Sequence, residues 1–168
     1  TPNYFATMGI ARVQGRDFDA QDIAEKPGVV IVNETFVKRH FKGEEALGKR
    51  LSMRGQQGPW LEIVGVVRDS KYATIGEAAL PYAYLPLAQN HETGMALMVR
   101  TAGNTAGVAA AVRNEVQALE RNLPLGNIAL MTELIGGALY AARMGAVLIA
   151  IFGGIALILA VVGLYGLL

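Results

Sequence analysis

The longest hydrophobic pattern of the chain lies at its end, where residues 144–168 contain no charged side chain. Fourteen of these residues are Leu, Ile, Val or Phe. A helix of this length would span roughly 37 Å, which exceeds the roughly 30 Å hydrocarbon core of a bilayer. The alternative is a buried core helix, but a small domain has little apolar surface to cover a helix that is apolar all round. The pattern therefore predicts a membrane-spanning helix.

Shorter apolar runs before residue 144 alternate with polar loops and predict strands. The β-branched runs at 29–32 and 60–68 are typical of buried strands, and Gly65 indicates a bulge or a close backbone contact inside the second run. Residues 81–87 carry two prolines, which predicts an edge strand. Weaker patterns predict four further strands, over residues 10–13, 49–54, 95–101 and 127–131.

Three short helices are predicted among these strands. The first covers residues 2–8 and ends at Gly9. The second covers residues 34–41 and begins after Asn33, whose side chain can accept a free N–H of the first turn. The third begins after Asn104 or Thr105 and carries an apolar stripe at helical spacing, formed by Val108, Val112, Val116 and Leu119.

A fourth helix is predicted to begin at Thr132 and to run into the membrane span as one stiff element; the alternative is a bend at Gly136 and Gly137, where the chain would turn along the membrane surface. Its first turns carry an apolar side formed by Leu134, Ile135, Ala138, Leu139 and Ala142. The fold class is therefore an α+β extracytoplasmic domain, a mixed sheet with two or more helices, followed by one transmembrane helix. We expect three parts: a domain over 1–131, a juxtamembrane helix over 132–143 and the membrane helix over 144–168.

Composition and charge narrow the function classes. All 15 basic and 14 acidic residues lie in the first 143 positions, so that region has the composition of a water-soluble domain. A net charge of +1 argues against a nucleic acid as the main partner, because no basic excess is available to neutralise phosphates. The chain has no cysteine, which excludes disulfides and thiolate metal sites. Both ends appear cut, so we expect a fragment of a larger membrane protein.

Small residues gather on one side of the predicted membrane helix. At 100° per residue the large apolar side chains cluster on the opposite half, and Ala156 and Ala160 have the spacing at which helix backbones approach closely. The alternative is that Gly and Ala are simply common in membrane helices. We expect this side to pack on neighbouring membrane helices, through Ala146, Ala150, Gly153, Ala156, Ala160 and Gly163.

No group of residues has the spacing of a catalytic or nucleotide site. Gly43, Gly48 and Lys49 match a phosphate-binding loop, but Arg50 stands where a hydroxyl must hold magnesium. The remaining candidates are His40 and His91, Ser52 and Ser70, and the adjacent Glu44 and Glu45, none of which has metal-ligand, nucleophile-elbow or acid–base spacing. We expect no catalysis, no cofactor and no metal.

Asn33, Glu34 and Thr35 also form a glycosylation sequon. Asn33 has a better structural reason to stand there, because it precedes a helix and can cap it.

Seven segments in order resemble the extracytoplasmic core domain of MacB-like ABC transporter permeases. The apolar tail that follows is similar to the first helix of an FtsX-like permease domain. The segments are NYFATMGI at 3–10, GRDF at 15–18, VVIVNETFVKRHF at 29–41, LGKRL at 47–51, EIVGVVRD at 62–69, YLPLAQ at 84–89 and VRNEVQALERNLP at 112–124.

This resemblance implies a permease subunit that couples ATP hydrolysis in the cytoplasm to movement of an extracytoplasmic domain, in efflux or mechanotransmission. The implied partners are the other membrane helices of the permease, a cytoplasmic ABC ATPase that is fused or separate, a second subunit in a dimer and a periplasmic adaptor. It implies the bacterial inner membrane, with residues 1–143 extracytoplasmic, and no catalytic residue in this region. The alternative is an extracytoplasmic binding or sensory domain on a single anchor.

Overall fold

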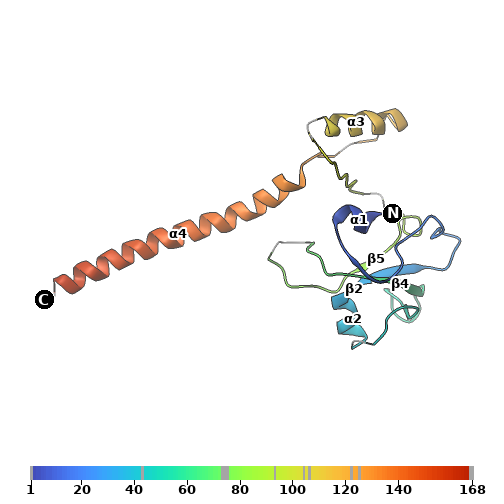
Figure 1. Ribbon diagram of the computed structural model, residues 1–168, viewed down its shortest axis with the longest axis horizontal. Helices are drawn as coiled ribbons and strands as arrows, with labels where there is room; N and C mark the ends of the chain where they lie inside the picture. The colour runs from blue at the N-terminus through green and yellow to red at the C-terminus, as the bar shows by residue number, and fades with distance from the viewer. Residues whose placement is uncertain are drawn as a thin grey trace. The chain divides into compact units, whose positions relative to one another are not determined.

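The computed structural model describes residues 2–42, 44–72, 76–92, 94–103, 105, 107–121, 123–124 and 126–166, without the side chains of 137–139, 141 and 142. The chain divides into two units, residues 1–103 and residues 104–168. The first unit holds α1 (Tyr4–Met8), β1 (Arg12–Gly15), β2 (Val29–Asn33), α2 (Glu34–His40), β3 (Arg50–Leu51), β4 (Leu61–Val67) and β5 (Ala83–Tyr84) (Figure 1). The second holds α3 (Val108–Leu119) and α4 (Met131–Tyr165).

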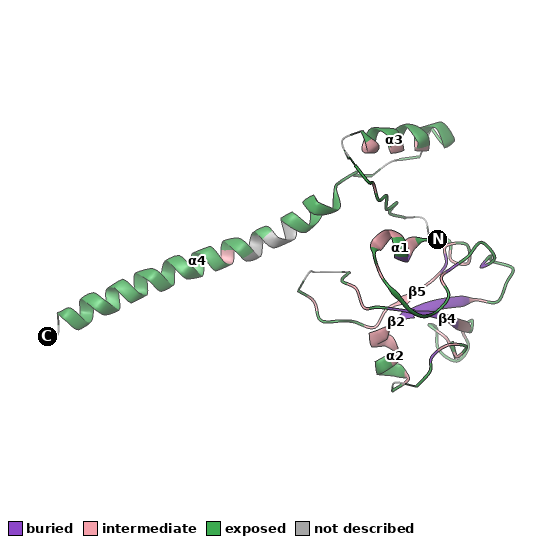
Figure 2. Cartoon of the chain, in the orientation of Figure 1, coloured by how far each residue is buried: buried purple, intermediate pink, exposed green. Residues whose placement is uncertain are grey.

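The strands of the first unit form one mixed sheet in the order β1, β4, β2, β5, and β3 also pairs with β4. The two central strands, β2 and β4, run parallel. Strands β1, β3 and β5 pair antiparallel with their neighbours. All five residues of β2 are buried, as expected for a central strand that is covered on both faces (Figure 2). The expected mixed sheet with helices is therefore confirmed.

Two facing glycines let β1 approach β4 closely. Gly15 lies opposite Gly65 in the ladder, and β4 has an irregularity at this point relative to β2. A Cβ atom on Gly65 would collide with the backbone oxygen of Arg16, and one on Gly15 would collide with the backbone oxygen of Val64. Both expectations for Gly65, a bulge and a close backbone contact, are confirmed.

The alternating side chains of the central strands supply two cores, one on each face of the sheet. Helix α1 contributes Phe5 to the first core, and α2 covers the second core with Phe36 and Val37 (Figure 1). The first core also contains Phe18, Val29, Ile31 and Val67. The second contains Val30, Val32, Ala46, Ile63 and Val66.

Helix α2 begins as predicted. The Asn33 side chain accepts a hydrogen bond from the backbone N–H of Phe36 at 3.0 Å, and Glu34 lies in the first turn, where its charge complements the helix dipole. Helix α1 also ends as predicted, because Gly9 adopts a left-handed φ of 72°.

The second unit consists of helices. Helix α3 keeps Val108, Val112 and Val116 half-buried, whereas Leu119 is exposed. Helix α4 is one uninterrupted helix of 35 residues that continues through Gly136 and Gly137. Its segment Arg143–Tyr165 is the one helix in the described part of the chain that is long and apolar enough to cross a membrane. The side chains of Ala138, Leu139 and Ala142, part of the expected apolar side, lie outside the described residues.

Several predicted strands are wrong or too long. The strand expected over 49–54 is reduced to the two residues of β3. Residues 95–101 and 127–130 are not strands, and Met131 already belongs to α4. A strand needs a neighbour to accept its backbone hydrogen bonds, and among the described residues no strand pairs with either segment. An apolar pattern carries no information about whether such a neighbour exists.

The helix caps predicted at Thr132 and Thr105 are also wrong. Helix α4 begins one residue before Thr132, and the N–H groups of Glu133 and Leu134 donate to the backbone oxygen of Leu130. Thr132 therefore lies inside the first turn and cannot cap it. Helix α3 begins after Gly107 without a side-chain cap, so Thr105 contributes only its backbone oxygen, and Asn104 lies outside the described residues.

Candidate functional site

The six residues expected to pack on other membrane helices all lie on α4 and are exposed (Figure 2). Beyond the adjoining backbone of α4 itself, no atom of the described structure lies within 4 Å of the place that a Cβ would occupy on Gly153 or Gly163. The large apolar residues are exposed as well, including Ile155 at 49% and Ile158 at 64%. Both sides of α4 are thus open in the single chain. The packing role of Ala146, Ala150, Gly153, Ala156, Ala160 and Gly163 stays a prediction.

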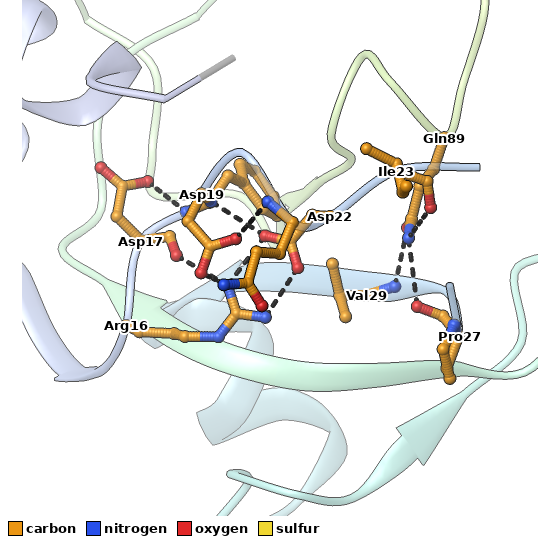
Figure 3. A network of polar contacts seen from close by, with 10 residues as sticks. Arg16, Asp17, Asp19, Asp22, Ile23, Pro27, Val29 and Gln89 are labelled. Carbon is orange, nitrogen blue, oxygen red and sulfur yellow. Dashed lines mark hydrogen bonds and ion pairs between the residues drawn. The ribbon is translucent and has the colours of Figure 1, made fainter. Parts of the chain in front are cut away.

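A polar network in the first unit surrounds Arg16, directly after β1 (Figure 3). Its guanidinium donates two hydrogen bonds to the Asp22 carboxylate, at 2.8 and 2.7 Å. Asp22 is only 5% exposed and also accepts the backbone N–H of Asp19 at 2.9 Å. The hydrogen bonds from Arg16 hold the pKa of Asp22 below its ordinary value, although burial opposes this shift. The same bonds raise the pKa of Arg16. Both shifts favour the charged forms, so the pair holds the loop together as an ion pair and is not suited to proton transfer.

Gln89 ties two remote segments together beside this network (Figure 3). Its amide nitrogen donates to the backbone oxygens of Ile23 and Pro27, both at 3.1 Å. Its amide oxygen accepts the backbone N–H of Val29 at 3.0 Å. The segment after β5 is thereby fixed to the loop that leads into β2.

A second network joins the ends of the parallel strands. The Asn33 amide donates to Asp69 at 2.6 Å and to the backbone oxygen of Leu80 at 2.7 Å. Asp69 also accepts the hydroxyl and the backbone N–H of Thr35, at 2.7 and 2.9 Å. Asn33 is 0% exposed, so its amide is inaccessible to a glycosylating enzyme. The interpretation of Asn33 as a helix cap holds, and the sequon is not an accessible acceptor.

Neither network was predicted from the sequence. The Arg16–Asp22 pair lies within one loop, and the several carboxylates that follow Arg16 are the only signal that could have suggested it. The Asn33–Asp69 contact spans 36 residues, and no local pattern indicates that these two side chains meet.

The candidate catalytic residues are dispersed. His40 and His91 are exposed, and no group of metal-ligating side chains occurs among the residues that the structure describes. The hydroxyl of Ser70 is buried next to Tyr84, away from both histidines. Ser52 lies just after β3.

The loop that resembles a phosphate-binding loop is engaged in its own contacts. Lys49 binds Glu44 at 2.7 Å and lies over the Phe41 ring, and its hydrogen bond holds the pKa of Glu44 below its ordinary value. The loop follows helix α2 rather than a strand, Gly43 lies outside the described residues, and the adjacent Glu45 is exposed. This geometry offers no helix N-terminus to a phosphate.

Comparison with known proteins identifies the first unit. The sequence profile of the MacB-like periplasmic core domain matches residues 1–118. The chain belongs to this family. The family match covers the sheet, both polar networks and nearly all of α3, and it ends before α4. The resemblance seen in the sequence motifs is thereby confirmed for the core domain.

One solved structure supports the MacB-like fold. The periplasmic region of MacB from Actinobacillus actinomycetemcomitans aligns with a TM-score of 0.51 at 22% identity, covering 70% of this chain and 53% of that one. The chain thus spans about half the length of that structure. A domain of a putative permease protein from Porphyromonas gingivalis aligns with a TM-score of 0.45 at 16% identity, covering 80% of this chain and 69% of that one. Among curated proteins, none matches the chain.

Proposed function

We propose that this chain is part of the permease subunit of an ABC transporter of the MacB/FtsX type. In this proposal the MacB-like domain lies outside the cytoplasm, and α4 is the first helix of an FtsX-like permease domain. The observation that carries the proposal is the continuity of α4, which runs from Met131 through Arg143 to Tyr165 without a break. The helix that precedes the membrane-length segment, from Met131 to Ala142, thus continues into that segment without an interruption.

The mechanism follows from that continuity. A helix of 35 residues is about 52 Å long, and its backbone hydrogen bonds resist extension and bending along the whole length. A displacement of the membrane helices, driven by ATP hydrolysis on a cytoplasmic ABC ATPase, fused or separate, would pass along α4 toward the region before it. The chain itself contributes no catalytic residue and no cofactor ligand in this scheme. A dimeric permease and a periplasmic adaptor complete the proposed assembly.

The charge distribution supports an extracytoplasmic orientation for residues 1–143 in a bacterial inner membrane. Among the twenty residues 124–143, Arg143 is the only Lys or Arg. Segments that flank a span on the cytoplasmic side carry an excess of Lys and Arg, so this flank is typical of the opposite side.

The coupling role is tested by comparing the two sides of α4. In the full-length permease with its ATPase in proteoliposomes, Ala156→Leu or Ala160→Leu should reduce the coupled ATPase rate by about threefold or more, because a larger side chain prevents close helix approach. The matched controls are Ile155→Leu and Ile158→Leu, which keep a large apolar side chain and should leave the rate within about a factor of two of the native rate.

Equal effects on both sides would contradict the coupling role. The helix would then be only an anchor, and a binding or sensory domain on a single anchor would become the better interpretation.

A further inference from the structure

A groove of about 390 Å³ lies in the first unit, between the loop after β1 and the segment after β5. Its lining is predominantly apolar and includes Phe18, Leu87 and Met95. Met95 is 66% exposed, although a large apolar side chain of this kind gains free energy when it is covered. Asp19 and Glu92 also line the groove, and both are exposed, so they lie where it opens to solvent.

Both walls of the groove are held by the contacts drawn in Figure 3. The first wall, which includes Asp19 and Asp22, is fixed by the two hydrogen bonds from Arg16 to Asp22. The second wall, the segment after β5, is fixed at Gln89 by hydrogen bonds to the backbone of Ile23, Pro27 and Val29. A groove with fixed walls costs a ligand little ordering free energy, which favours binding. The hydrogen bonds of Arg16 and Gln89 would thus serve to shape a binding groove rather than to catalyse a reaction.

The charge at the groove opening is negative. Asp22 is neutralised by Arg16, but Asp19 has only a longer contact to the same guanidinium, at 3.4 Å. Glu92 forms no ion pair with any basic side chain in the described part of the chain. Two carboxylates beside an apolar floor favour a ligand that carries a positive charge next to apolar groups.

We propose that this groove docks a segment of a protein partner in which a Lys or Arg side chain stands beside apolar side chains. The proposal is independent of the transport role.

The test uses the full chain in nanodiscs of zwitterionic lipid, with ¹³C-labelled methionine methyl groups as reporters. The probe is the blocked peptide Lys-Leu-Leu-Lys, and empty nanodiscs measure its binding to lipid. We expect a saturable shift of the Met95 methyl signal and no shift at Met53, which lies outside the groove lining. The peptides Glu-Leu-Leu-Glu and Lys-Ser-Ser-Lys should bind more weakly, because each lacks one of the two required features.

Variants assign the binding to the groove. The double variant Asp19→Asn with Glu92→Gln should weaken binding of Lys-Leu-Leu-Lys by roughly three- to tenfold, the sum of two exposed ion pairs. The control double variant Glu44→Gln with Glu45→Gln, away from the groove, should bind as the native chain does. Unchanged methyl signals of Met8 and Met53 verify the fold of each variant.

Three results would overturn the proposal. The first is the absence of a saturable Met95 shift, and the second is equal binding by the two double variants. The third is a Met95 shift that develops on raising the protein concentration without peptide, which would identify a second copy of the chain as the occupant.

Discussion

At the scale of single residues, the Arg16–Asp22 pair is the clearest energetic feature of the domain. Asp22 is buried, so its charge requires compensation, and the bidentate guanidinium supplies it. A hydrogen bond to a charged group contributes about 1.5 to 3 kcal/mol to stability. The side chain of Arg16 is 43% exposed, and solvent screening therefore brings the contribution of this pair toward the lower end of that range.

The pair predicts a pH dependence of stability. Because the folded-state pKa of Asp22 is lowered, its contribution is present above the unfolded pKa of about 3.9 and is lost as pH falls through the folded value. Asp22→Asn should reduce the free energy of unfolding by about 1 to 2 kcal/mol at pH 7. This deficit should shrink as pH falls below about 3.9, because Asp22 then takes up a proton in the unfolded chain and the charged native pair loses its advantage.

Urea unfolding of the detergent-solubilised chain, followed by the fluorescence of Trp60, measures this difference. The control is Glu45→Gln at an exposed position, which should change the free energy of unfolding by less than about 0.5 kcal/mol at either pH. A deficit for Asp22→Asn that is the same at pH 7 and pH 3 would show that the carboxylate charge is not what stabilises the loop.

Asn33 shows which contacts of a residue can be predicted from the local sequence and which cannot. The cap at Asn33 was predictable, because a polar residue precedes an amphipathic run and the partner N–H lies three residues away. The contacts that Asn33 makes with Asp69 and Leu80 were not predictable. They depend on strands β2 and β4 lying parallel, which only the folded sheet establishes.

At the scale of elements, the central strands were predicted well and the outer segments poorly. Buried strands such as β2 carry their own signal, a β-branched run that suits a two-sided core. Residues 95–101 carry a similar apolar pattern, but Leu97 is 71% exposed and no strand pairs with the segment among the described residues. This segment is instead tied to the rest of the unit by a long-range contact. The Arg100 side chain donates a hydrogen bond to the backbone oxygen of Thr7.

The pairing of β1 with β4 depends on the glycines at their crossing. Gly15 has both a left-handed φ of 73° and a Cβ position that the Val64 oxygen occupies, whereas Gly48 has a left-handed φ of 72° and open space around it. Gly15→Ala should therefore lower the free energy of unfolding by roughly 2 to 5 kcal/mol, the sum of backbone strain and overpacking. Gly48→Ala carries the strain alone and should cost roughly 1 to 2 kcal/mol.

The same urea titration compares the two alanine variants directly. Equal losses would mean that β1 can move away from β4 without cost, and that the close approach of these strands is not needed for stability.

At the scale of the whole molecule, the chain combines a MacB-like domain with an apolar helix of a different character. The first unit buries its apolar residues on both faces of one sheet. The segment Arg143–Tyr165 instead exposes its apolar side chains throughout. The sequence predicted this division because all charged residues precede Met144. The sequence left a bend at Gly136 and Gly137 open, since two adjacent glycines weaken a helix by about 1 kcal/mol each, but α4 continues through both as one helix.

The most direct test of the account is the topology of the domain in intact bacterial cells. Residues 1–168 contain no cysteine, so Gln57→Cys, in a full-length protein from which any other cysteine has been removed, places a single exposed thiol in the loop between β3 and β4. A membrane-permeant maleimide serves as the control for reactivity. If the domain lies outside the cytoplasm, a membrane-impermeant maleimide will label this thiol in intact cells as fully as after lysis. Labelling by the impermeant reagent only after lysis would contradict the proposed topology and the function built on it.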